Sequence, residues 1–169
     1  MRALLQRVSR AEVRVAGEPV GAIGRGLLVL LGLAPGDDEA AADALARRVV
    51  ELRIHEDRNG RTNLALGEVG GAVLVVSQFT LYADTRRGRR PGITGAAAPD
   101  HAEAIYQRFC LALEGTGTQV EGVGSGRRWK WSSSTTVPSR SGWTARIAEH
   151  GARHATTRHG PGRQVEGRA

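Results

Sequence analysis

Two long, mostly apolar segments dominate the pattern of this 169-residue chain. Residues 26–33 have the sequence GLLVLLGL and residues 72–80 have the sequence AVLVVSQFT. Apolar residues without alternation predict strands that are buried on both faces, as in parallel sheets covered by helices. Each segment has the length of a strand and is too short to cross a membrane, so we expect no membrane span.

Shorter patterns between these segments predict the rest of the fold. Residues 2–8 and 12–15 predict a kinked strand, and residues 19–23 predict a further short strand after a glycine turn. One helix is expected from Asp37 or Asp38 to about residue 53, because an acidic cap precedes apolar residues at helical spacing. Asn59-Gly60 predicts a hairpin turn.

A second helix is expected to begin at Pro99, and a strand to begin at residues 118–120. The apolar stripe of this second helix consists of Ala102, Ile105, Tyr106, Phe109, Leu111 and Leu113. Strands that alternate with two helices, together with hairpins, predict an α/β single domain with a mixed sheet.

Charge divides the chain at about residue 121. Residues 1–121 contain 15 arginines and 15 acidic residues, whereas residues 122–169 contain 9 basic and 2 acidic residues and carry the whole net charge of +7. The second part also contains all three tryptophans and no leucine, so it can bury little apolar surface. We expect a folded domain over residues 1–121 and a basic tail over residues 122–169, disordered from residue 145.

The common catalytic and metal-binding motifs are absent from the sequence. There is no glycine-rich phosphate loop ending in Lys-Ser/Thr, and the single cysteine, Cys110, excludes a disulfide framework. His55 and His101 are expected at the surface. His150 and His154 lack a carboxylate or thiolate neighbour. We predict no metal and no other cofactor, and an N-terminus without the apolar core of a signal peptide favours a cytoplasmic location.

The segment with the most candidate functional groups is residues 77–91, SQFTLYADTRRGRRP. Its first four residues are expected to end a buried strand: Ser77, Gln78, Phe79 and Thr80. Polar groups in such a place are either hydrogen-bonded or functional. The four residues therefore form either an ordinary strand end, whose hydroxyls bond nearby backbone, or a pocket that places a hydroxyl near a reacting carbonyl. Four arginines follow, either as a solvated loop or as a phosphate-binding loop suited to RNA: Arg86, Arg87, Arg89 and Arg90.

A series of motifs also lies in order between Met1 and about residue 122. The longest is residues 74–84, LVVSQFTLYAD, and the others are Gln6-Arg7-Val8, residues 24–30, residues 52–54, Asn63-Leu64 and Gly70-Gly71. Together they resemble the D-aminoacyl-tRNA deacylases, enzymes that remove D-amino acids from mischarged tRNA. The resemblance implies a barrel-like α/β unit that works as a homodimer, with active sites at the dimer interface.

The resemblance also implies roles for individual residues. Ser77, Gln78, Phe79 and Thr80 match the family's first signature, which lines the pocket for the aminoacyl end of the tRNA. Thr80 is the candidate nucleophile for hydrolysis of the ester, but the sequence places no histidine or carboxylate to activate it. We favour the alternative, in which backbone groups and the RNA's 2′-hydroxyl act while residues 77–80 position the substrate. The residues expected to contact the tRNA are Arg7, Arg86, Arg87, Arg89 and Arg90.

The family's second signature, Asn-x-Gly-Pro-Val-Thr near the C-terminus, has no counterpart in this chain. In the family its Gly-Pro enters the partner subunit's pocket and excludes L-amino acids. Residues 127–144, translated in another frame from permitted codons, give Asn-Asp-Gly-Pro-Val-Thr within a family-like strand. We infer a frame change near residues 122–125, so that the family's last strand is missing and a sheet edge is left open.

Three functions are compatible with these features. The first is hydrolysis of D-aminoacyl-tRNA, and of glycine on the wrong tRNA, as a proofreading step in translation. The second is non-catalytic RNA binding by the basic, tryptophan-containing tail, and the third is an inactive degenerate family member. The motifs favour the first, with D-aminoacyl-tRNA and a second copy of the chain as partners and no membrane contact.

Overall fold

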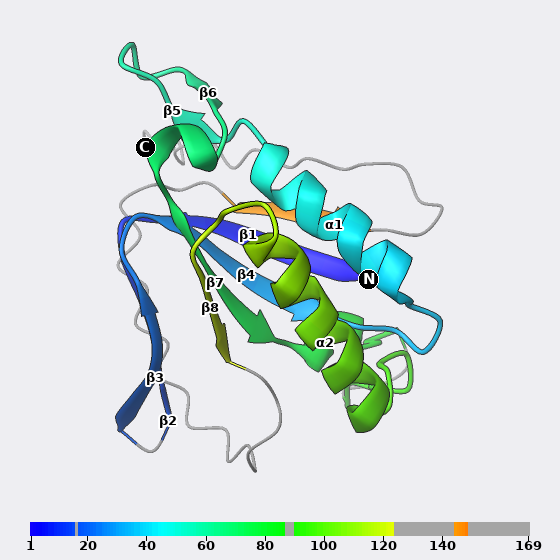
Figure 1. The fold of residues 1–169 in the computed structure, drawn as a ribbon. Helices are drawn as coiled ribbons and strands as arrows, with labels where there is room; N and C mark the ends of the chain where they lie inside the picture. The colour runs from blue at the N-terminus through cyan, green and yellow to red at the C-terminus, as the bar shows by residue number, and fades with distance from the viewer. Residues whose placement is uncertain (16, 87–89, 124–143, 149–169) are drawn as a thin grey trace, which may run out of the picture.

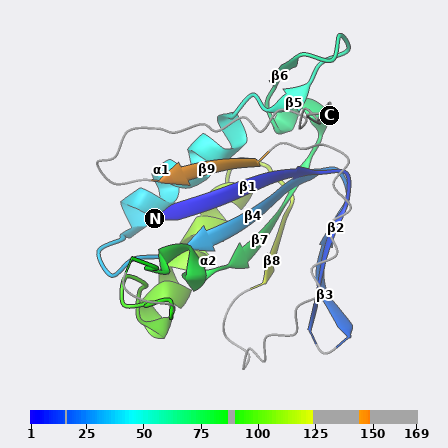
Figure 2. The same ribbon diagram turned by 180° about the vertical axis from the view of Figure 1, so that it is seen from behind.

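A computed structural model describes residues 1–15, 17–86, 90–123 and 144–148 of the chain. Its centre is a five-stranded mixed sheet with the order β8-β7-β4-β1-β9 (Figure 1, Figure 2). The strands are β1 (Arg2–Val8), β4 (Gly26–Gly32), β7 (Ala72–Ser77), β8 (Val120–Val123) and β9 (Thr144–Ala148). β4, β7 and β8 run parallel to one another, whereas β1 is antiparallel to both β4 and β9.

Two helices, two hairpins and two short 3-10 helices complete the described part. The helices are α1 (Glu39–Glu51) and α2 (Pro99–Glu114), and the 3-10 helices are η1 (Gly67–Val69) and η2 (Phe79–Tyr82). The hairpins pair β2 (Ala11–Val15) with β3 (Glu18–Ile23) and β5 (His55–Glu56) with β6 (Thr62–Leu64). α1 lies in the crossover from β4 to β7 and α2 in the crossover from β7 to β8, and both helices cover the same face of the sheet (Figure 1).

Alternate residues of the central strands divide the core into two layers. Under the helices, Val29 and Val75 pack in one cluster with Leu45 and Phe109, and all four are fully buried. The cluster on the opposite face joins the sheet to the β2–β3 hairpin and contains Val8, Ala11, Val13, Ile23, Leu28, Ala72, Leu74, Val76 and Val123. Because both faces of β4 and β7 are covered, these strands are apolar throughout, as the sequence predicts.

The helix boundaries confirm the cap predicted for α1 and correct one detail of α2. The Asp38 side chain accepts a hydrogen bond from the Ala41 backbone N–H over 2.8 Å, so Asp38 is the N-cap. The predicted apolar stripe of α2 is wrong at Leu111, which is 61% exposed, whereas Phe109 and Leu113 are buried. Leu111 follows Phe109 by two residues and therefore points to the opposite side of the helix.

Two expectations about the strands also need correction. The strand expected over residues 72–80 ends at Ser77, and η2 begins two residues later. The tail is not disordered throughout residues 145–169, because residues 144–148 form β9 and pair with β1 from Gln6 to Arg2. The edge of β1 is therefore covered. The absence of the family's own last strand and the barrel-like closure stay predictions.

Candidate functional site

The candidate site lies at the carboxyl edge, which we define as the end of the sheet where β4 and β7 terminate. The Gln78 backbone N–H donates to the Leu31 carbonyl over 2.7 Å and extends the β4–β7 ladder by one residue. The chain then turns into η2, with a 3.2 Å bond from the Leu81 N–H to the Gln78 carbonyl. The 3-10 turn thus carries residues 79 and 80 out of the sheet, where 50% of Phe79 is exposed.

A glycine in β4 makes this turn possible. A Cβ on Gly32 would lie 2.9 Å from Leu81 Cβ and 3.2 Å from the Gln78 carbonyl oxygen. The first distance is shorter than packed carbon atoms tolerate and the second is tight, so a side chain at this position would push η2 away from β4. The absence of a Cβ on Gly32 therefore fixes where the exposed residues of η2 stand.

Gln78 and Thr80, both predicted site residues, are joined by a hydrogen bond. The Gln78 Nε2 donates to the Thr80 Oγ1, so one lone pair of this hydroxyl is already occupied. A nucleophilic hydroxyl requires a base that accepts its proton, and the Gln78 amide nitrogen is a donor only. The contact therefore orients the Thr80 hydroxyl without activating it. Ser77, at the end of β7, is half-buried beside them.

Arg2 supports η2 from β1, a role that no motif in the sequence indicates. Its Nη1 donates to the Leu81 carbonyl over 2.8 Å, and its Cζ lies 4.3 Å from the centroid of the Tyr82 ring. Burial, together with the negative charge of Asp37, raises the pKa of Tyr82 to about 12, although the Arg2 guanidinium opposes this shift. The Tyr82 phenol is therefore protonated at neutral pH and is no base.

The predicted arginine loop follows the turn. Asp84 and Gly92 exchange backbone hydrogen bonds of 2.7 and 2.9 Å, which close the loop between them. Arg86 donates to the Asp84 carboxylate, and this pairing raises the pKa of Arg86 and lowers that of Asp84. Arg90 is exposed, and the predicted phosphate contacts Arg87 and Arg89 lie outside the described residues. Arg86 and Arg90 thus follow η2 closely in the sequence, and both are exposed at the surface.

Arg7, the other arginine predicted to contact tRNA, lies at the opposite end of β1. Its Nη1 donates to the Ile54 carbonyl over 2.8 Å and its Nη2 pairs with Glu56 over 2.7 Å. The structure therefore does not bring Arg7 together with Ser77 and Thr80. Beside it, His55 is fully buried, and both of its ring nitrogens lack hydrogen-bond partners among the described residues.

The expectation of a surface position for His55 is therefore wrong. The imidazole lies near Arg7 and Arg25, and burial, with these charges, lowers the pKa of His55 to about 4. His101 is half-buried, and its Nε2 lies 2.8 Å from the Asp37 backbone oxygen. The two histidines are thus at opposite ends of the sheet. In the described part of the chain, no group of three or more His, Cys, Asp or Glu residues could hold a metal ion.

A family model described as D-Tyr-tRNA(Tyr) deacylase matches residues 4–133. The chain belongs to this family. Two curated relatives named D-aminoacyl-tRNA deacylase, from Symbiobacterium thermophilum and Anaeromyxobacter dehalogenans, are each 58% identical over 121 residues. These matches cover 72% of this chain and 80% and 81% of the relatives. About a fifth of each deacylase relative therefore has no counterpart in the aligned part.

Solved structures show the same fold. A protein described as c-Myc DNA Unwinding Element Binding Protein has a TM-score of 0.79 and 29% identity, and the match covers 89% of this chain and 100% of that one. A probable eukaryotic D-amino acid tRNA deacylase has a TM-score of 0.72 and 18% identity, with 86% and 97% covered. The deacylase family's mixed α/β architecture is thus shared. Among the helices described in this chain, none is long and apolar enough to cross a membrane.

Proposed function

We propose that this chain descends from an enzyme that hydrolyses the ester of D-aminoacyl-tRNA, and that residues 77–80 receive the aminoacyl end. The observation that carries the proposal is the exposed η2 turn at the carboxyl edge, built from the segment that matches the family's first signature. The same reaction on glycine attached to the wrong tRNA, in a proofreading step in the cytoplasm, is part of the proposal. The working form is a homodimer with the site at the subunit interface.

The mechanism we propose is positional. The Gln78–Thr80 contact holds a polar surface beside the exposed Phe79, against which the aminoacyl ester can be oriented. Neither Thr80, which accepts from an amide, nor Tyr82, which is protonated, supplies a base. Activation of the attacking water is therefore assigned to the RNA's own 2′-hydroxyl. Stabilisation of the developing oxyanion is assigned to backbone N–H groups.

Phosphate contacts are assigned to the arginines beside η2. Arg86 and Arg90 are exposed, and a positive loop close to the pocket suits the backbone of an acceptor stem. Arg87 and Arg89 belong to the same proposal on sequence grounds. Arg7 would contribute to RNA binding only from the opposite end of β1, because its guanidinium is engaged by Ile54 and Glu56.

We further propose that residues 122–169 are an out-of-frame tail. This tail replaces the family's second signature, the Gly-Pro element that excludes L-amino acids, which we call the chiral gate. The family's Asn-x-Gly-Pro-Val-Thr signature is absent from the sequence. The alignment with the Symbiobacterium thermophilum relative spans 121 residues, and the family model matches as far as residue 133. Without the gate, the chain has no steric means of excluding L-amino acids. The chain with the present C-terminal sequence, which we call the printed chain, is then inactive or unselective. A chain in which the original reading frame is restored after about residue 122, the frame-restored chain, is a selective deacylase.

The test compares the printed chain with a frame-restored chain that ends in the Asn-Asp-Gly-Pro-Val-Thr strand. Both are assayed for release of amino acid from D-Tyr-tRNA, L-Tyr-tRNA and Gly-tRNA. We expect the restored chain to hydrolyse D-Tyr-tRNA and spare L-Tyr-tRNA, and the printed chain to be at least tenfold slower or to lose this preference. Sequencing the gene across codons 118–146 decides which chain is made.

A matched pair of glutamine variants tests the site within the restored chain. Gln78→Ala removes the contact to Thr80 and is expected to lower the rate at least tenfold. Gln107→Ala, on the exposed side of α2 where Gln107 bonds Glu103, should leave the rate unchanged. Failure of both the printed and the restored chain to hydrolyse any of the three substrates would contradict the proposal.

A non-catalytic RNA-binding role is the second candidate, favoured by the basic tail with its three tryptophans. The structural neighbour described as a DNA unwinding element binding protein shows that this fold occurs in a protein named for nucleic-acid binding. This role predicts tRNA binding by the printed chain with a steep dependence on salt. Binding that survives replacement of Trp129, Trp131 and Trp143 by alanine would argue against this role.

A further inference from the structure

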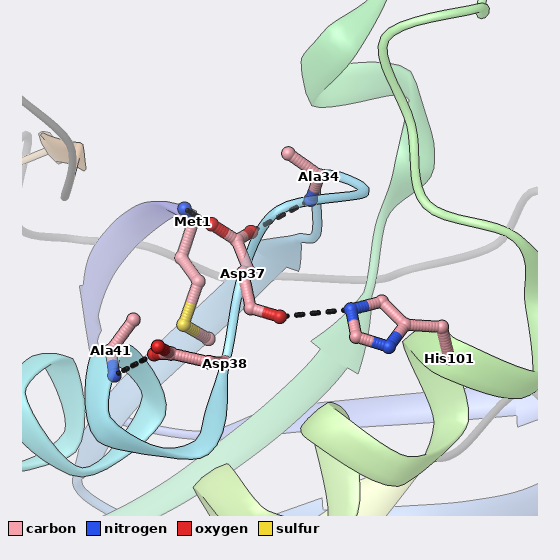
Figure 3. A network of polar contacts seen from close by, with 6 residues as sticks. All are labelled: Met1, Ala34, Asp37, Asp38, Ala41 and His101. Carbon is pink, nitrogen blue, oxygen red and sulfur yellow. Dashed lines mark hydrogen bonds and ion pairs between the residues drawn. The ribbon is translucent and has the colours of Figure 1, made fainter.

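The amino terminus of the chain is buried at the carboxyl edge. The α-amino group of Met1 donates to Asp37 Oδ1 over 2.5 Å (Figure 3). Met1 is 1% exposed and belongs to the core cluster under the helices, and Asp37 is 4% exposed. A buried carboxylate requires a compensating charge or several hydrogen bonds. The chain's own terminal ammonium group supplies that charge.

The rest of Asp37 is bound by the loop between β4 and α1. Its Oδ2 accepts from the Ala34 backbone N–H over 2.7 Å, and its own N–H donates to the Ala34 carbonyl over 3.1 Å. Its backbone carbonyl can only accept, so the His101 Nε2 at 2.8 Å is the donor and links the loop to α2 (Figure 3). The ammonium group thus sits at the centre of a network that joins β1, the loop after β4, and α2.

This network adjoins the turn that carries the candidate site. Arg2, the residue after the terminal ammonium group, bonds the Leu81 carbonyl and lies over the Tyr82 ring. The negative charge of Asp37 also acts on Tyr82, whose pKa it helps to raise. Two consecutive residues at the start of β1 therefore hold both the loop after β4 and η2.

We propose that an unmodified, positively charged α-amino group on Met1 is a structural cation of the carboxyl edge, and that formylation, acetylation or N-terminal extension disorders the 34–37 loop and loosens η2. An amide at this nitrogen has no charge and a single N–H. Asp37 Oδ1 would then be a buried anion without its cation, while the added group would have to displace packed core residues. Folding of this edge is thereby coupled to the chemical state of the terminus.

The experiment uses the full chain with a short extension that a protease removes directly before Met1. The same preparation is measured before and after cleavage, by thermal unfolding and by hydrogen exchange at the Ala34 and Leu81 amides. We expect cleavage to raise Tm by roughly 6 °C or more and to slow exchange at both amides at least tenfold. An extended form that does not fold until it is cleaved supports the proposal in the same way.

Two matched aspartate variants isolate the ion pair. Asp37→Asn removes the anion, and Asp38→Asn is the control, because asparagine is as good an N-cap as aspartate. In Asp37→Asn, cleavage of the extension should raise Tm by less than half as much as in the parent, since the two changes break one interaction. In Asp38→Asn the full effect of cleavage should remain.

Equal Tm and equal exchange before and after cleavage in the parent chain would overturn the proposal. So would a cleavage effect of the same size in Asp37→Asn as in the parent, because it would assign the effect to crowding by the extension. Both readouts are independent of deacylase activity, so a failure here is distinct from a failure of the proposed function.

Discussion

The two ends of β1 differ in whether the buried polar groups beside them have bonding partners. At the carboxyl edge, the Met1 ammonium group pairs with Asp37 and Arg2 bonds Leu81. At the other end, Arg7 bonds Ile54 and Glu56, but the neighbouring His55 is fully buried with both ring nitrogens unpartnered among the described residues. The first end uses its polar groups to position an exposed turn. The second buries an imidazole that must remain neutral, which makes it the end more sensitive to acid.

The largest predicted effect compares alanine substitutions at the two ends of β4. A Cβ on Gly26 would lie 1.8 Å from the Ala72 backbone oxygen, whereas a Cβ on Gly32 meets its nearest atom, Leu81 Cβ, at 2.9 Å. Gly26→Ala must therefore separate two strands, and we expect it to lower the free energy of unfolding by at least about 3 kcal/mol. Gly32→Ala should cost about 1–2 kcal/mol, because η2 can shift. Urea unfolding of both variants measures the difference, and a greater loss in Gly32→Ala would contradict it.

The second prediction concerns the pH dependence of stability. Burial lowers the pKa of His55 to about 4, below its value of about 6.5 in an unfolded chain. Between these values the unfolded state binds a proton that the folded state does not, so stability falls as the pH falls from 6.5 to 4, by up to about 3 kcal/mol. His55→Phe keeps an aromatic ring and should abolish this loss.

Unfolding in urea at pH 7 and pH 4.5 measures the effect. A second variant, His101→Gln, serves as the control at the carboxyl edge, and we expect the pH-dependent loss to persist in it. An unchanged loss in His55→Phe would show that another group is responsible.

The third prediction compares the two arginines of β1. Arg7→Ala should lower the free energy of unfolding by about 1–2 kcal/mol, mainly through loss of the partly buried hydrogen bond to the Ile54 carbonyl. Glu56 is about half exposed, so its ion pair contributes little. Arg2→Ala should cost a similar amount. The two variants are expected to differ in which part of the molecule is loosened. Only Arg2→Ala should speed hydrogen exchange at the Leu81 and Ala83 amides, because Arg2 bonds η2 and Arg7 does not. Faster exchange there in Arg7→Ala would remove the distinction between the two ends.

The smallest predicted change in stability tests the chemistry of the turn. Thr80 is exposed, so Thr80→Val should change the free energy of unfolding by less than about 0.5 kcal/mol. In the frame-restored chain, loss of a positioning hydroxyl should slow D-Tyr-tRNA hydrolysis by less than about a hundredfold, whereas loss of a nucleophile would abolish it. Single-turnover rates at saturating enzyme separate the two outcomes.

Most of the secondary structure could be predicted, because burial on both faces and helical spacing are visible in a single sequence. The apolar runs of β4 and β7 and the N-cap of α1 at Asp38 are examples. The end of β7 could not be predicted. Gln78 bonds Leu31, and η2 packs on Gly32, so the turn depends on a neighbouring strand far away in the chain.

The site was predictable only in part, for the same reason. Ser77–Thr80 could be proposed because polar residues follow an apolar run directly. Arg2, and the pairing of Met1 with Asp37, depend on the antiparallel register of β1 and β4, which residue type does not reveal. The burial of His55 was missed because a polar residue predicts exposure, and nothing in the local sequence indicates that the imidazole lies beside Arg7 and Arg25.

The pairing of β1 with β9 has a consequence for the order of events during synthesis. β1 meets β4 after a connection that contains only the β2–β3 hairpin, but Arg2 pairs with Ala148, from the far end of the described chain. On the ribosome, β1, β4, β7 and β8 all emerge before β9, and closing so long a loop carries a larger entropic cost than any other pairing in the sheet. The outer side of β1 therefore stays open until last, and during that interval a strand from another nascent chain can occupy it.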